Sequence, residues 1–152
     1  LEKAQKKKQP VWYYYDNDSD NGAKFGKLYN WYAVNDPRKL APEGWHIPAD
    51  NEWTVLTDHL GGKEVAGNKM KSTSGWSNNG NGTNESGFNG LSGGLCNANG
   101  SFYDIGGGGY WWSALDTEVN DAWGRGLYAD YGNVFRSNNI RMDGLSVRCL
   151  RD

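Results

Sequence analysis

The residue alternation in the C-terminal third of the chain constrains the fold most. Residues 123–128 alternate Trp, Arg and Leu with Gly, Gly and Tyr, and Val134 and Arg136 continue this period of two. Because successive side chains of a strand point to opposite faces, a strand here places the two sets on opposite sides of a sheet. We therefore expect strands after Tyr110, with residues 146–150 as the closing strand.

The first half of the chain predicts short local elements. Residues 11–15 are β-branched and aromatic and are followed by the turn-rich stretch 16–22, which predicts a short strand. The apolar residues of 26–34 fit one side of a short helix, with a strand as second choice. Residues 49–60 follow Pro48 and carry apolar residues at i, i+3 and i+7 before Gly61-Gly62, so they are the strongest helix prediction.

A glycine-rich segment separates these two halves. Residues 72–109 hold 12 of the 22 glycines, mixed with Asn and Ser, and predict little regular structure. Four scattered aromatic residues are expected to pin this segment to the core: Trp76, Phe88, Phe102 and Tyr103. Helices, an irregular region and then antiparallel strands predict an α+β fold.

Length and charge limit the possible classes of protein. The 152 residues fit a single domain over 11–152, with the polar, Lys-rich residues 1–10 as a linker, the end of a stalk or a cloning remnant. The formal net charge is −2 although the first eight residues contribute +3, so the body is mildly acidic and binding to nucleic acid is not expected. No stretch approaches the ~18 apolar residues of a membrane span, so membrane insertion is not expected either.

Few residues suggest chemistry. Cys96 and Cys149 are too few for a disulfide scaffold and are wrongly spaced for zinc; a disulfide and two free thiols both stay open. His46 and His59 have no nearby nucleophile or third metal ligand, and His46 is expected to be a structural hydrogen-bonding residue.

Calcium is a weak candidate ligand. Asp16, Asp18 and Asp20 resemble the start of a calcium loop, but Asn21 stands where Gly is wanted and Lys27 where a bidentate Glu belongs. A solvated Asx turn is the favoured interpretation, and no cofactor is expected.

Four spaced motifs carry a family resemblance over about Tyr13 to Asp152. They are Gly-Trp-His-Ile-Pro at 44–48 with Glu52-Trp53, Tyr-Trp-Trp-Ser at 110–113, Ala-Trp-x-Arg-x-Leu at 122–127 and Gly-x-Ser-Val-Arg-Cys at 144–149. In this order they resemble the Fibrobacter succinogenes major paralogous domain. That family resembles the formylglycine-generating enzymes, which implies a C-type lectin-like fold with two short helices, antiparallel strands, a long irregular loop region and termini close together. Ala49 stands where the family often has a capping Thr or Ser, and Asp50 is the expected substitute.

Residues 114–143 are similar to the variable region of diversity-generating retroelement target proteins, in which an error-prone reverse transcriptase rewrites adenines in Asn-type codons. The fixed frame is intact, and many residues between frame positions can be reached from Asn codons by changing adenines. An ordinary family member with drifted loops is the alternative. The resemblance implies a non-enzymatic receptor-binding domain of a bacterial surface or phage tail protein, located outside the cell, on its surface or on a virion. Its partner would be a protein or glycan on another surface, and a homo-trimer would suit this setting.

The alternation gives this interpretation a physical basis. Trp123, Leu127 and Val134 are expected to pack inward, while Arg125 and Arg136 are paired or bonded to loop carbonyls. Tyr, Ser and Asn on the other face are typical of binding loops. The candidate ligand-binding residues are Leu115, Asp116, Glu118, Gly124, Gly126, Tyr128, Asp130, Tyr131, Phe135, Ser137, Asn138, Asn139 and Ile140, with the three aromatic ones as anchors.

Two other functions remain as alternatives. The first is a carbohydrate-binding or adhesion module of constant sequence, although the motifs of calcium-dependent sugar-binding lectins are absent from the sequence. The second is an enzyme of the formylglycine-generating type, but the sequence around Cys96 and Cys149 does not match the copper-binding cysteine pair of those enzymes. No catalytic residue is therefore predicted.

Overall fold

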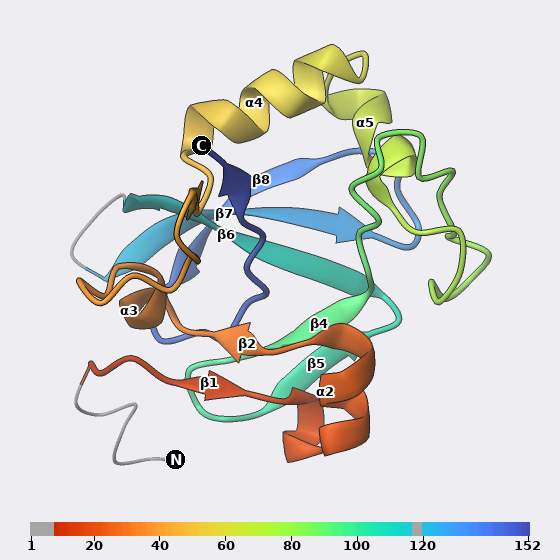
Figure 1. Cartoon of the computed structure of the whole chain (residues 1–152). Helices are drawn as coiled ribbons and strands as arrows, with labels where there is room; N and C mark the ends of the chain where they lie inside the picture. The colour runs from red at the N-terminus through yellow and green to blue at the C-terminus, as the bar shows by residue number, and fades with distance from the viewer. Residues whose placement is uncertain (1–7, 117–119) are drawn as a thin grey trace.

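A five-stranded sheet organises the fold, which is of the α+β class (Figure 1). The computed structural model describes residues 8–116 and 120–152. The strand order is β5-β4-β6-β7-β8, and every neighbouring pair is antiparallel except β4 and β6. The strands are β4 (Gly93–Cys96), β5 (Phe102–Ile105), β6 (Gly108–Asp116), β7 (Asp121–Tyr128) and β8 (Phe135–Ile140).

The N-terminal part adds short elements on one side of this sheet. Strand β1 (Trp12–Tyr13) pairs with β2 (Leu28–Tyr29), and η1 (Tyr15–Asn17) and α2 (Ser19–Phe25) lie between them. The strand predicted in 11–15 is confirmed, but the single helix predicted for 26–34 is wrong in its first half. Helix α3 (Trp31–Val34) begins only after Asn30, whose side chain accepts a hydrogen bond from the Ala33 N–H and so caps the helix there.

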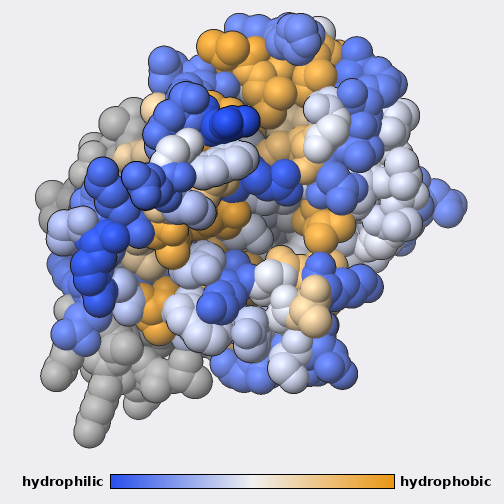
Figure 2. Space-filling view, in the orientation of Figure 1, coloured by the Kyte–Doolittle hydropathy of each residue, from blue (hydrophilic) through white to orange (hydrophobic). Residues whose placement is uncertain are grey.

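The predicted helix at 49–60 is confirmed as α4 (Asp50–His59), which packs against β6 and β7. Its Trp53 is 2% exposed and joins a core with Trp111 and Leu127. Helix α5 (Lys63–Met70), which the sequence did not predict, follows directly and buries Met70 in the same core. Figure 2 shows hydrophobic residues gathered near α4, where Val55 and Val65 are exposed, and polar residues over much of the rest of this face.

The sheet is covered on both faces. On the face toward α4 and α5, hereafter the helix face, lie Trp111 and Leu127. On the other, hereafter the far face, a second core contains Trp31, Trp112 and Leu145. Burial on both faces means that the alternation of β7 does not separate inside from outside along its whole length.

The glycine-rich segment is only partly irregular. Residues 72–92 hold no strand or helix among the described elements, and Trp76 pins them by donating its indole N–H to Ser72 Oγ (3.0 Å) and the Gly90 carbonyl (3.1 Å). The prediction is wrong for 93–105, which form β4 and β5. Gly94 explains the difference: it has a φ of +66°, and a Cβ there would lie 2.4 Å from the Tyr103 carbonyl oxygen, so glycine lets the two strands approach. Tyr103 is exposed and is not a pin.

The C-terminal residues close the fold against the middle of the chain. Strand β9 (Leu150–Arg151) pairs with β3 (Trp45–His46). The closing strand predicted at 146–150 is therefore wrong except for Leu150, because residues 146–149 belong to no strand. Ser146 instead makes an isolated bridge to Trp111. Within the described part of the chain, every helix is too short or too polar to cross a membrane.

Candidate functional site

Three aromatic rings meet at the surface where β7 turns into β8. The ring centroids of Tyr128 and Phe135 are 5.1 Å apart, those of Tyr131 and Phe135 5.7 Å, and those of Tyr128 and Tyr131 6.3 Å, all with edge-to-face geometry. Tyr131 is 56% exposed and Phe135 37%, whereas Tyr128 is half-buried against Tyr110. The three predicted anchors therefore lie side by side, and we call them the aromatic cluster.

Glycine makes room beneath the cluster. Gly126 pairs with Phe135 across the strands, and a Cβ on Gly126 would lie 3.3 Å from the Tyr128 ring and 3.5 Å from Tyr110. Gly126 and Gly124 were expected on an exposed face, and this is wrong because both are buried. Their face is the far face, where Leu145 and other core residues cover β7.

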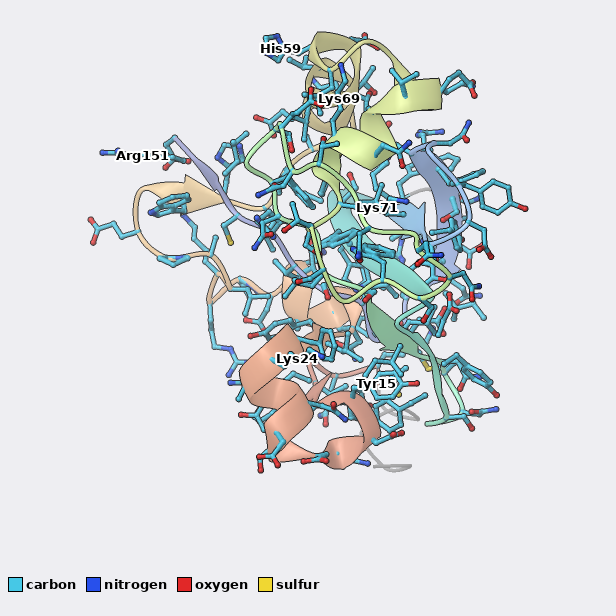
Figure 3. All side chains as sticks on the ribbon, turned by 90° about the vertical axis from the view of Figure 1, so that its right-hand side faces the viewer. Tyr15, Lys24, His59, Lys69, Lys71 and Arg151 are labelled. Carbon is cyan, nitrogen blue, oxygen red and sulfur yellow. The ribbon has the colours of Figure 1, made fainter. Side chains whose placement is uncertain are left out.

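A buried ammonium group fixes the turn that carries the cluster. Lys71 follows α5, is 1% exposed, and donates hydrogen bonds from Nζ to the carbonyls of Tyr128 (3.1 Å), Tyr131 (3.0 Å) and Ala129 (3.5 Å) (Figure 3). Three acceptors match the three donors of an ammonium ion. Burial lowers the pKa of Lys71, and the nearby Asp130 carboxylate opposes that shift.

Close glycine contacts hold the same turn from its sides. A Cβ on Gly80 would lie 2.3 Å from the Ala129 carbonyl oxygen, and a Cβ on Gly67 would lie 2.3 Å from that of Asn133. The backbones of α5 and of the loop around residue 80 therefore touch the turn directly. Asp130, at the exposed tip, accepts a hydrogen bond from Asn78 Nδ2 (3.2 Å). A cavity of about 350 Å³ lies between this loop and the turn.

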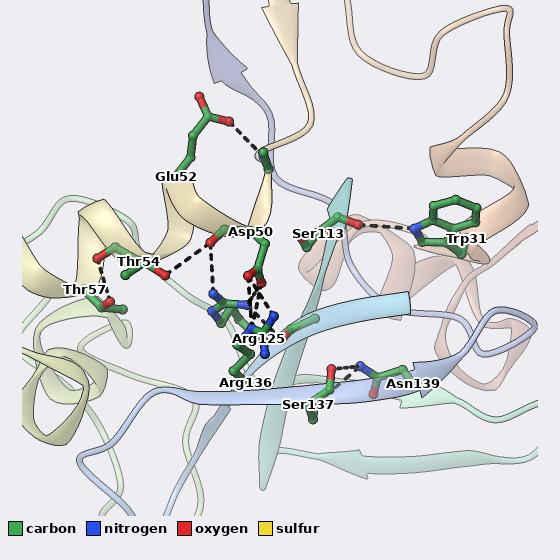
Figure 4. A network of polar contacts seen from close by, with 12 residues as sticks. Trp31, Asp50, Glu52, Thr54, Thr57, Ser113, Arg125, Arg136, Ser137 and Asn139 are labelled. Carbon is green, nitrogen blue, oxygen red and sulfur yellow. Dashed lines mark hydrogen bonds and ion pairs between the residues drawn. The ribbon is translucent and has the colours of Figure 1, made fainter. Parts of the chain in front are cut away.

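A carboxylate shared by two arginines joins α4 to β7 and β8 (Figure 4). Arg125 is 4% exposed and lies 2.7 Å from Asp50 Oδ1, and Arg136 lies 2.9 Å from Asp50 Oδ2. Burial alone would raise the pKa of Asp50, but hydrogen bonds from the two guanidinium groups outweigh it and lower the pKa. The expected pairing of the arginines is confirmed, and the partner is the start of α4 rather than loop carbonyls.

Two details of this region differ from expectation. Asp50 was expected to cap α4, but it binds the arginines instead, and Glu52 accepts the Ala49 N–H at 2.8 Å. Trp123 was expected in the core, and this is wrong, because the residue is only half-buried. Its ring is covered by the Arg136 guanidinium, whose Cζ lies 3.3 Å from the ring centroid.

The remaining predicted site residues follow β8. Asn138 and Ile140 are exposed, whereas Ser137 and Asn139 are half-buried, and Asn139 Nδ2 donates to the Ser137 carbonyl (3.0 Å). Glu118 and the side chains of Leu115 and Asp116 lie outside the described residues. The structure thus brings Asp130 and the aromatic cluster together with Ser137 and Asn139, which share the sheet face of Phe135. Asn138 and Ile140 were expected on the same surface, and this is wrong, because they alternate with these residues along β8 and lie on the other face of the sheet.

The calcium candidate gains no support from the geometry. Asp18 caps α2 by accepting a hydrogen bond from the Asp20 N–H (2.9 Å), as an Asx turn does. Across residues 8–116 and 120–152, no three His, Cys, Asp or Glu side chains are grouped so that they could hold a metal ion.

The histidine and the cysteines have structural surroundings. His46 Nδ1 lies 2.7 Å from Asp152 and Nε2 lies 2.9 Å from Glu52, so the prediction of a structural hydrogen-bonding role is confirmed. Cys96 and Cys149 are both free thiols, which decides between the two alternatives left open. Burial raises the pKa of the Cys96 thiol to about 11, so it is a poor nucleophile at neutral pH.

The motifs at 110–113 and 122–127 lie in strands β6 and β7, which carry the site just described. The family model of the Fibrobacter succinogenes major domain matches residues 1–151. The chain belongs to this family. Comparison with the curated proteins and with the solved structures gave no match.

The family motifs have clear positions in this member of the Fibrobacter succinogenes major domain family. Trp111 and Trp112, from the Tyr-Trp-Trp-Ser motif, are buried on opposite faces of the sheet. Arg125, from the motif at 122–127, anchors α4. Sequence reasoning missed Lys71, because a lysine after a helix gives no signal that it is buried.

The His46 contacts predict a pH-dependent stability. Hydrogen bonds to Glu52 and then Asp152 raise the pKa of His46, so its contribution to stability is complete below the ordinary histidine pKa and is lost as pH rises through the folded-state value. We expect the difference in melting temperature between wild type and His46→Gln to shrink as pH rises above the ordinary histidine pKa of about 6.5. His59→Gln is the control, and a difference that grows with pH would contradict the assignment.

Proposed function

We propose that this domain is a non-enzymatic recognition module that binds a protein or glycan on another surface through the aromatic cluster and the neighbouring residues of β8. The observation that carries the proposal is the exposure of Tyr131 and Phe135 on a turn whose carbonyls are held by the buried Lys71. A surface that is ordered before binding loses little conformational entropy when its ligand arrives.

The composition of the surface fits this role. Tyr and Phe bring large contact areas with few rotatable bonds, and aromatic residues dominate the energetics of many interfaces. Asp130, exposed on the turn, adds a charge, and Ser137 and Asn139, on the same face of β8 as Phe135, add a hydroxyl and an amide. These polar groups would set which ligand is accepted, while the rings supply most of the affinity.

Diversification of residues 114–143 is part of the proposal. Exposed positions such as Asp130, Tyr131 and Ile140 can change without altering the core, whereas the frame residues Leu127 and Arg125 hold it. Gly124 and Gly126 are buried, so we propose that variation at these two positions is restricted to small residues. The variable surface then consists of the turn and β8.

The gene neighbourhood tests diversification separately. We expect a reverse-transcriptase gene and a near-copy of the segment coding for residues 114–148 that differs from it at adenines. If neither the reverse-transcriptase gene nor the near-copy is present, the surface has a constant sequence and the diversification part of the proposal is wrong.

A C-type lectin-like fold and a place outside the cell, on a cell surface or on a virion, complete the proposal. The pairing of β3 with the late strand β9 and the irregular segment 72–92 support the fold assignment. The location follows from the proposed partner, since a ligand on another surface is met outside the cell.

One observation favours a constant carbohydrate-binding module as the second candidate. The cavity of about 350 Å³ beside the turn is lined by amide side chains, and the exposed Tyr131 stands at it. Amides can exchange hydrogen bonds with sugar hydroxyls, and an aromatic ring offers a flat apolar surface to a sugar ring. The lower alternative, an enzyme of the formylglycine-generating type, gains no comparable support from the buried Cys96 thiol.

The binding surface can be tested by truncating its anchors. A panel of glycans and surface proteins is first screened with the wild-type domain to obtain a ligand. We then expect Tyr131→Ala and Phe135→Ala each to weaken binding by about 2 kcal/mol, roughly 30-fold, with little change in melting temperature.

Tyr103→Ala is the matched control, because Tyr103 is 51% exposed but lies on β5 at the other edge of the sheet. Binding by titration calorimetry and melting by circular dichroism are the measurements. Equal loss of affinity in all three variants, or a large fall in melting temperature for the two anchors, would count against the proposed surface.

A further inference from the structure

Strand β8 is an edge strand that no described strand covers along residues 136–140. It pairs with β7 in an unbroken register of six residue pairs, and no other described strand lies on its outer side (Figure 1). Edge strands of soluble proteins are commonly protected by charged side chains, proline, a bulge or a covering helix. β8 has the sequence Phe-Arg-Ser-Asn-Asn-Ile, without proline or a bulge, and its one charged side chain, Arg136, is engaged by Asp50.

The flanking hydrogen bonds show which backbone groups of β8 face outward. The Val134 N–H donates to the Lys63 carbonyl (2.7 Å), away from β7, whereas the Arg141 N–H donates to the Asn120 carbonyl (2.8 Å), beside the start of β7. Alternate residues of an antiparallel pair turn their backbone groups to the same side. The residues that face the open edge are therefore those of even number: Arg136, Asn138 and Ile140.

The side chains leave this edge accessible. Asn138 is exposed, Ile140 is 48% exposed, and the Arg136 side chain is 43% exposed while it binds Asp50. A strand of six residues offers an edge of about 20 Å, enough for several backbone hydrogen bonds.

We propose that β8 pairs with β8 of a second copy of this chain, antiparallel and about a two-fold axis at Asn138. In this register Asn138 lies opposite its own counterpart and Arg136 lies opposite Ile140 of the second copy. Only this register places each of Arg136, Asn138 and Ile140 opposite one of the same three residues in the second copy. The two sheets then join into one of ten strands, a closed and self-complementary contact.

The side chains are compatible with this register. Arg136 would lay its aliphatic stem beside Ile140 of the second copy, and Ser137 would lie beside Asn139. No like charges stand opposite each other, whereas a register centred on Arg136 would place two arginines face to face. The two Arg136 residues stay four positions apart along the strand, roughly 13 Å.

The dimer has a consequence for recognition that rests on the proposed function. A two-fold axis perpendicular to the joined sheet keeps the far faces of both copies on one side, so both aromatic clusters face the same way. Two weak contacts with one ligand-bearing surface then reinforce each other. Pairing itself is independent of any ligand.

The purified chain alone tests the pairing. Because the edge is short, we expect weak association: the weight-average mass in sedimentation equilibrium rises toward that of two copies as concentration rises into the range of about 1 mM. Amide hydrogen exchange by NMR locates the contact. The amides of Arg136, Asn138 and Ile140 should become slower to exchange with concentration, whereas those of Phe135, Ser137 and Asn139 are slow at every concentration.

Three variants separate this contact from others. Asn138→Pro removes an outward N–H and leaves the bonds to β7, so it should abolish dimerisation. Ile140→Lys would face Arg136 of the second copy and should weaken association about tenfold, whereas Ile140→Glu should not. This charge pair keeps the proposal testable if Asn138→Pro fails to fold.

Several results would overturn the proposal. They are a monomer at all concentrations, equal effects of Ile140→Lys and Ile140→Glu, or exchange protection that does not follow the even-numbered residues. A mass of three copies that Asn138→Pro leaves unchanged would also overturn it, in favour of a trimer held elsewhere.

Discussion

The structure depends on a buried ammonium group with three carbonyl partners. Lys71 Nζ binds the backbone of Tyr128, Ala129 and Tyr131, so it holds the turn between β7 and β8 in one shape. A lysine that is 1% exposed costs free energy to desolvate, and here hydrogen bonds offset that cost. Without these bonds the turn carbonyls would lose a charged donor, and the aromatic cluster its support.

The shared carboxylate of Asp50 plays the corresponding role on the helix face. It fixes Arg125 of β7 and Arg136 of β8 to the first turn of α4, and Arg136 in turn covers Trp123. Lys71 thus holds the turn that joins β7 to β8, and Asp50 holds the two strands themselves. The proposed recognition surface of changeable sequence needs such a support, so that its exposed residues differ in size and charge while the backbone keeps its path.

The sequence predicted those parts of the fold in which a local pattern and the final packing agree. Pro48 and the spacing of Trp53 and Leu56 predicted α4, and the alternation after Tyr110 predicted β7 and β8. Strands β4 and β5 were missed because glycine content suggests irregular backbone, whereas at Gly94 it allows two strands to approach.

The candidate site was predicted in part for similar reasons. Tyr128, Tyr131 and Phe135 were expected together and are found together. Gly124 and Gly126 were placed on an exposed face because a period of two gives no information on whether the second face is also covered. Lys71 could not be found from sequence, because its burial depends on carbonyls 57 to 60 residues away.

The central claim is that Lys71 keeps the turn and its aromatic cluster in place before any ligand binds. Backbone ¹⁵N relaxation on the free domain, in wild type and in Lys71→Met, tests it most directly, because methionine keeps the apolar stem and removes the three donors. We predict order parameters for residues 128–133 near those of β7, about 0.85, in wild type and below about 0.6 in the variant. Low values already in wild type, or unchanged values in Lys71→Met, would contradict the account.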